Sequence, residues 1–169
     1  MSDIPPKDFA EGAGQFDLLR ARRLVKRLTP YCGSPIELML ACYVDSIVRG
    51  MDATLTIALT DEDVESAPQF YLRPQHQIGA HRVDFLIGRA GKQPIIVECD
   101  GREFHHSTRS QIERDRARDA DLLAKGFRVI RYPGTEIHNN PWRVVTEIVV
   151  EVDRDWYFAF WQANLEFTK

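Results

Sequence analysis

The period of the hydrophobic pattern changes several times along the chain, and each change predicts a new element. Residues 83–87 and 94–98 are short runs of β-branched and apolar side chains, joined by a turn-like segment, 89–93. This pattern is typical of a β-hairpin. Residues 70–78 predict a strand before the hairpin, in which Pro74 favours an edge or a bend. Residues 127–132 predict a further strand after it.

Two segments ahead of these strands are less regular. Between residues 53 and 60, leucine and isoleucine alternate with threonine, which favours a half-exposed strand but leaves a short helix open. Residues 61–65 are acidic, and we interpret them as a surface loop that would repel DNA and lie away from any binding cleft.

Helical spacing of apolar residues predicts four helices. They cover 16–28, a segment that starts at Ser34, a segment from Ser107 or Thr108 to about residue 125, and a last one that starts at Asn140–Pro141. The second has serine at the N-cap, Pro35 at the first position and Glu37 at the third, the order of a capping box. Gly126 ends the third helix. In the last helix, Val144, Val145, Ile148, Val149 and Val152 form an apolar stripe against the sheet.

Length and composition predict one soluble domain. The chain has 169 residues, of which 44% are hydrophobic and 28% charged, as in ordinary globular proteins. We expect a flexible N-terminal arm over residues 1–14 and one domain over 15–169. No apolar run has membrane-spanning length and no signal peptide is evident, so we expect a cytoplasmic protein without a membrane partner. The three cysteines are widely spaced, which predicts reduced thiols.

The aromatic segment 155–161 and the net charge bear on possible partners. The aromatic segment has two interpretations, a docked C-terminal segment and a homodimer contact. A net charge of −3 argues against nonspecific coating of nucleic acid, although it allows a nuclease with a local basic surface.

Acidic side chains interrupt the predicted hairpin. Asp84 lies within the first apolar strand, and Glu98 and Asp100 leave the second strand on one face. Carboxylates in apolar strands are costly unless they are compensated, and a hard cation such as Mg²⁺ can compensate them. Pairing with the many arginines of the chain is the alternative, and the spacing alone favours neither.

Resemblance to known nucleases favours the metal. Asp84 and Glu98 on neighbouring strands resemble the PD-(D/E)xK nuclease core, with Asp100 where that motif has lysine. The blocks 98–101, 104–105, 113–116 and 126–129 together resemble the very-short-patch repair endonucleases and their small bacterial relatives.

This resemblance implies an α/β restriction-endonuclease-like core, a central mixed β-sheet flanked by helices, and an endonuclease that hydrolyses DNA. Asp84, Glu98 and the carbonyl of Cys99 would bind Mg²⁺ or Mn²⁺. Glu37 would join them from the first core helix, although a capping box alone also explains it. Asp100 and His105 would handle protons in place of the missing lysine. The cysteine and histidine cluster that holds zinc in the very-short-patch enzymes has no match here, so we expect a zinc-free version.

Several basic and polar residues are candidate DNA contacts. Arg20, Arg23 and Arg27 recur at helical spacing in the most basic segment, where a solvated helix face is the alternative. Asp115 and Asp119 are predicted to turn inward, with Arg131, Arg128 or strand-end amides as partners. Arg114 and Arg118 form the neighbouring row and could grip a phosphate.

Two further hypotheses concern the glutamines of the predicted strand 70–78 and the function of the protein. Gln75 and Gln77 are predicted to point the same way, where they either contact DNA, orient a water molecule or lie on the outer face of an edge strand. A non-catalytic DNA-binding or defence-associated module on the same fold is the alternative function.

Overall fold

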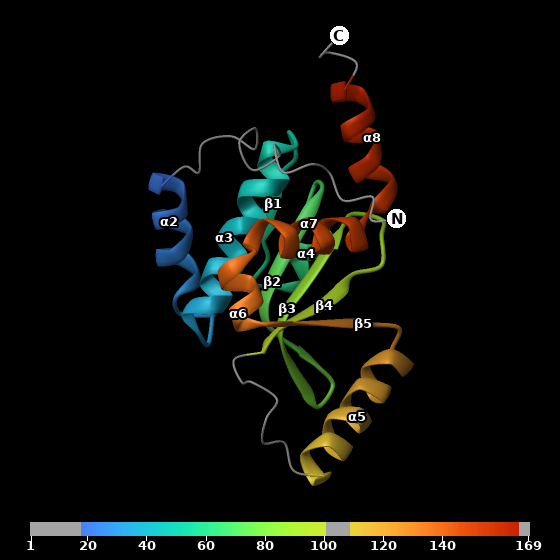
Figure 1. Cartoon of the computed structure of the whole chain (residues 1–169). Coiled ribbons are helices and arrows are strands. Elements are labelled where there is room, and N and C mark those ends of the chain that lie inside the picture. The colour runs from blue at the N-terminus through green and yellow to red at the C-terminus, as the bar shows by residue number, and fades with distance from the viewer. Residues whose placement is uncertain (1–17, 101–108, 166–169) are drawn as a thin grey trace.

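The computed structural model describes residues 18–100 and 109–165, which form a mixed five-stranded sheet with helices on both faces (Figure 1). The strands follow chain order across the sheet. They are β1 Leu55–Ile57, β2 Phe70–Ile78, β3 His81–Arg89, β4 Ile95–Asp100 and β5 Arg128–Pro133. The outer pairs β1–β2 and β4–β5 are parallel, and the two inner pairs are antiparallel. The α/β fold with a central mixed sheet is therefore confirmed.

Seven helices are present in the described ranges. They are α2 Leu18–Leu28, α3 Pro35–Gly50, α4 Asp61–Glu65, α5 Arg109–Ala124, α6 Gly134–Asn139, α7 Pro141–Val152 and α8 Arg154–Leu165. No helix in this part of the chain is long and apolar enough to cross a membrane. The predicted arm, 1–14, lies outside the described residues, and the single domain over 15–169 stays a prediction.

Two apolar clusters hold the sheet between its helices. The larger, here called the α3/α7 core, joins the buried faces of these two helices to one face of the sheet, where Phe85 and Val97 are fully buried. The smaller, the α5 core, joins Leu122 of α5 to Leu86 and Ile96 on the other face. The apolar stripe predicted for α7 lies in the α3/α7 core, so that prediction is confirmed.

The long β2–β3 hairpin extends beyond the body of the sheet and reaches α5 (Figure 1). At its tip, His81 contacts Asp121 at 2.9 Å, and Ile78 joins the α5 core. The part of β2 that pairs with β1 ends before Arg73, and Pro74 follows Arg73. Pro74 therefore sits on an edge, where its missing N–H costs no sheet hydrogen bond.

Two connecting segments differ from the sequence prediction. Residues 61–65, expected to be a loop, form α4, because Thr60 and Asp63 exchange the two hydrogen bonds of a capping box. After β5, residues 134–139 form α6, a helix that the sequence pattern did not predict. Both elements are too short to show a periodic apolar pattern, and only α4 has a side-chain cap.

The C-terminal helix α8 packs against its own chain and extends from the end of the molecule opposite to α5 (Figure 1). Tyr157 is 1% exposed, and Trp156 lies 4.7 Å from Phe70 between ring centroids. Buried Asp153 accepts a hydrogen bond from the Trp156 N–H and pairs with Arg89. The docked interpretation of the aromatic segment is therefore confirmed, while the homodimer stays a prediction.

Candidate active site

Four neighbouring strands bring polar residues into one row across the sheet. Gln75 and Asp84 lie between the pairs Pro74–Phe85 and His76–Val83 of β2 and β3, and their side chains are in contact. One step beyond the last β3–β4 pair, Asp84 stands opposite Glu98, and Glu98 in turn pairs with Arg131 of β5. These four residues, here called the polar row, lie where the regular pairing of β3 with β4 ends. A row of polar side chains inside an otherwise apolar sheet requires compensation.

The backbone is irregular where β2 and β3 contribute to this row. Gln75 has φ 48°, the left-handed conformation that residues other than glycine rarely adopt. In β3, Phe85 lies in the α3/α7 core but Val83 lies in the α5 core, although a regular strand would turn both to the same side. The alternation therefore breaks at Asp84, between them. Irregular backbone of this kind is concentrated at functional sites.

Glu37 reaches the row from the start of α3. Ser34 is the N-cap and Pro35 lies in the first turn, as predicted, and the Ser34 side chain accepts from the Glu37 N–H. The buried Glu37 carboxylate accepts from the Gly33 N–H at 2.8 Å, from the Ser34 hydroxyl at 2.9 Å and from Gln75 Nε2 at 2.9 Å. Capping and a place in the site are thus compatible, because one carboxylate does both.

Asp84 is the second carboxylate that Gln75 contacts. Its Oδ1 accepts from Gln75 Nε2 at 3.3 Å, and its Oδ2 accepts from the Cys99 N–H at 2.9 Å. Burial raises the pKa of Asp84, and the negative charges of Glu37 and Glu98 raise it further, against the two hydrogen bonds that lower it. Burial and the two neighbouring carboxylates thus outweigh the two hydrogen bonds in their effect on the pKa of Asp84.

Glu98, in contrast, is compensated by arginines. Arg118 of α5 donates to both of its carboxylate oxygens, and Arg131 Nε lies 3.3 Å from Oε2. Arg131 also forms a two-bond pair with Asp119, which confirms the partner predicted for that residue. Asp115, predicted to turn inward as well, is exposed, so that expectation is wrong. The two arginines and two acids form one network across β4, β5 and α5.

The residues present fit a hard divalent cation on one side of the row. Glu37 and Asp84 offer carboxylate oxygens that accept from the same Gln75 amide, and the Cys99 N–H contacts Asp84 from β4. Glu98 would have to release Arg118 to join them. Within residues 18–100 and 109–165, no group of three or more His, Cys, Asp or Glu is arranged to hold a metal. The metal ligands predicted from the sequence therefore stay predictions.

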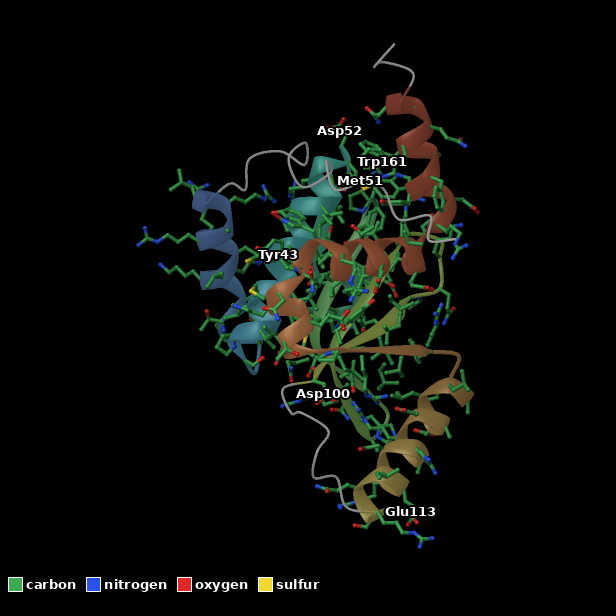
Figure 2. All side chains as sticks on the ribbon, in the orientation of Figure 1. Tyr43, Met51, Asp52, Asp100, Glu113 and Trp161 are labelled. Atoms are coloured by element: carbon green, nitrogen blue, oxygen red, sulfur yellow. The ribbon has the colours of Figure 1, made fainter. Side chains whose placement is uncertain are left out.

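Asp100 and Cys99 end β4 beside this site. In the view of Figure 2, Asp100 lies between Tyr43 of α3 and Glu113 of α5. The Cys99 thiol is free, and burial raises its pKa, so the thiol stays protonated and only the backbone of Cys99 can serve the site. His105, the other predicted proton-handling residue, lies outside the described residues.

The predicted basic face of α2 is partly used within the protein. Arg20 forms a two-bond ion pair with buried Asp45, and Arg27 donates to the Ile57 carbonyl at 3.2 Å. Arg23 is exposed. Two of the three arginines therefore help to attach α2 to the domain, and phosphate contact by this face stays a prediction.

The remaining predicted DNA contacts lie apart from the row. Gln77 is exposed and donates to the Gly79 carbonyl, whereas Gln75 contacts the carboxylates, so the expectation that both point the same way is wrong. Arg114 is exposed on α5 and donates to the Ser110 carbonyl. Sequence reasoning grouped Gln75 with Gln77 by regular alternation and therefore did not place it beside the carboxylates. The only signal was the bend that Pro74 predicted.

Sheet order, flanking helices and an acidic site at the end of a β-hairpin define a restriction-endonuclease-like protein. Comparison with protein families supports this class. The chain matches the family described as REase_MTES_1575 over residues 43–152, more than half of its length, and therefore belongs to this restriction-endonuclease-like family. Membership indicates a nuclease function, with DNA as the substrate of the class. The match includes the polar row, and Glu37 precedes it.

The other two comparisons add nothing to this assignment. Neither the curated proteins nor the solved structures contain a match to the chain. The family supports a nuclease, but the resemblance to very-short-patch repair enzymes in particular is not confirmed by it.

Proposed function

We propose that the chain is a metal-dependent endonuclease that hydrolyses phosphodiester bonds in DNA. One observation carries the proposal: two acids from separate elements, Glu37 and Asp84, converge on the same amide group in a chain of a nuclease family. Carboxylate oxygens that converge on one position are suitable ligands for a hard cation. The cation would be Mg²⁺ or Mn²⁺.

Each part of the site has a separate task. When bound, the cation would lower the pKa of a water molecule and neutralise charge that develops on the phosphate. Asp84, Glu37 and the Cys99 carbonyl would hold it. The hydrogen bonds from Gly33 and Ser34 fix the Glu37 carboxylate, and the Cys99 N–H fixes that of Asp84. Both ligands are thus oriented before the cation arrives.

Protons and phosphates are handled around this centre. Asp100 and His105 accept and donate protons, the task that lysine has in the PD-(D/E)xK motif. Arg118 and Arg131 bring positive charge to the β4 side, where Glu98 keeps both guanidinium groups oriented. A phosphate of the DNA backbone is the anion that such a pair would attract. Arg23 on α2 supplies a further, sequence-independent contact.

Incubation of the purified chain with DNA tests the proposal. The substrates are supercoiled plasmid, single-stranded DNA and a duplex with one mismatch, each with Mg²⁺, Mn²⁺ or EDTA. We expect cleavage with either cation and none with EDTA. Preference for the mismatched duplex would support a repair-like role of the very-short-patch kind. Absence of cleavage on every substrate, by protein that is folded and binds DNA, would contradict the proposal.

A second function is favoured by the arginine pairs of Glu98. A carboxylate held by two guanidinium groups is stable without a metal, as in a DNA-binding module that has lost catalysis. Such a module would bind the same DNA with equal affinity in EDTA and in Mg²⁺. Binding without cleavage in every condition would therefore favour this alternative.

A further inference from the structure

Gln75 occupies the position between the two carboxylates. Its Nε2 lies 2.9 Å from a Glu37 oxygen and 3.3 Å from an Asp84 oxygen, and it donates to both. An ionised carboxylate can only accept hydrogen bonds, so the NH₂ end of the amide has to face the pair. The amide thus holds together two groups that repel each other.

The backbone of Gln75 is adapted to this contact. At φ 48° it is one of two residues other than glycine with positive φ among those described, and it lies in the middle of a strand. In a regular strand, side chains alternate between the two faces of the sheet, so residues two apart lie on the same face. Gln75 would then share the exposed face of Gln77. The left-handed conformation is maintained where it delivers the amide to the site, which points to a function of this residue.

We propose that Gln75 is the third, neutral member of the cation site of Glu37 and Asp84. Its NH₂ group holds the carboxylates in the absence of a cation, and its oxygen becomes a ligand when a cation binds. This inference rests on the proposed function, since it concerns the same site.

The chemistry of the amide supports both roles. An N–H group cannot coordinate a cation, but rotation of the terminal amide exchanges Nε2 and Oε1 without movement of the main chain. Amide oxygens are suitable ligands for hard divalent cations. A neutral third ligand also leaves two negative charges, from Glu37 and Asp84, to balance a divalent cation. A third carboxylate at this position would bind the cation more strongly but would destabilise the cation-free protein.

Calorimetric titration with Mn²⁺ tests the inference on the full-length chain. Gln75→Met keeps an unbranched side chain of similar length but removes the amide, and Gln75→Glu replaces the amide by a carboxylate. Gln77→Met is the matched control, since Gln77 lies two residues along the same strand and contacts only its own hairpin. Asp84→Asn reports on the site itself. Melting temperatures in EDTA and in Mn²⁺ are measured for each protein.

The two substitutions at Gln75 should act in opposite directions. Gln75→Met should weaken Mn²⁺ binding by about 10- to 100-fold, as loss of a supporting group does at metal sites. Gln75→Glu should bind Mn²⁺ at least as tightly as the wild type, melt at a lower temperature in EDTA and gain more from Mn²⁺. Gln77→Met should match the wild type in both measurements.

Different failures have different meanings. Binding that Asp84→Asn abolishes, but that both Gln75 variants keep unchanged, would overturn the inference and leave the proposed function intact. Equal weakening by Gln75→Met and Gln75→Glu would also overturn it, because a purely structural bend predicts that result. If the wild type does not bind Mn²⁺ at all, the cation site and the inference are both wrong.

Discussion

Replacement of Arg118 by methionine would measure how strongly Glu98 depends on its arginines. The Arg118 side chain is 25% exposed and that of Glu98 12%. Removal of one partner from a buried ion pair costs about 3–5 kcal/mol, and from an exposed pair at most about 1 kcal/mol. This pair lies between the two limits, and Arg131 keeps a contact at 3.3 Å. We therefore expect Arg118→Met to lower the free energy of unfolding by about 2 kcal/mol.

Urea unfolding followed by tryptophan fluorescence would test this value. Arg114→Met is the matched control, because Arg114 lies one turn earlier on α5 and is exposed, and it should change the free energy by less than about 0.5 kcal/mol. Adding Glu98→Gln to Arg118→Met should recover at least half of the loss, since it removes the uncompensated charge. A loss no larger than that of the control, or no recovery in the double variant, would refute the reasoning.

Three further predictions concern other parts of the domain. The raised pKa of Asp84 means that its contribution to stability is present below the ordinary value of 3.8 and is lost as pH rises through the folded pKa. Urea titrations at several pH values should show that Asp84→Asn becomes more stable relative to the wild type as pH rises through the folded pKa of Asp84. Burial raises the pKa of Asp153, but the Trp156 N–H and Arg89 lower it more, so Asp153→Asn should cost about 1–2 kcal/mol at neutral pH and less in acid. Gly88→Ala should cost about 1–3 kcal/mol in the same assay, because its Cβ would lie 2.4 Å from the Tyr71 ring.

Strong periodic patterns predicted most of the fold. The hairpin of β3 and β4, the capped start of α3 and the apolar stripe of α7 follow from local rules that tertiary contacts reinforce. The helices that were not predicted, α4 and α6, are short segments with few apolar residues. In α4, five residues with no buried side chain depend on the Thr60 cap, which the acidic composition concealed. α6 has no side-chain cap at all, so its sequence gave little indication of a helix.

The site was predictable in part. Asp84 and Glu98 interrupt apolar strands, and that interruption is visible in sequence. Which of them is compensated is a long-range property, because Arg118 and Arg131 come from elements that follow the hairpin. The position of Gln75 depends on one left-handed residue, and no periodic rule anticipates it. Sequence patterns thus identified the acids, while the tertiary structure distinguishes Glu98, which arginines hold, from Asp84, which accepts from an amide and a backbone N–H.

The most direct test of the central claim compares plasmid cleavage by the wild type, Asp84→Asn and Glu37→Gln at equal concentrations of folded protein. With Mg²⁺, we predict that the wild type cleaves and that each variant is slower by more than about 100-fold, because loss of a supporting group alone costs about 10- to 100-fold at metal sites. EDTA should abolish the wild-type activity. Cleavage by Asp84→Asn at the wild-type rate would contradict the account, since this carboxylate is the centre of the proposed site.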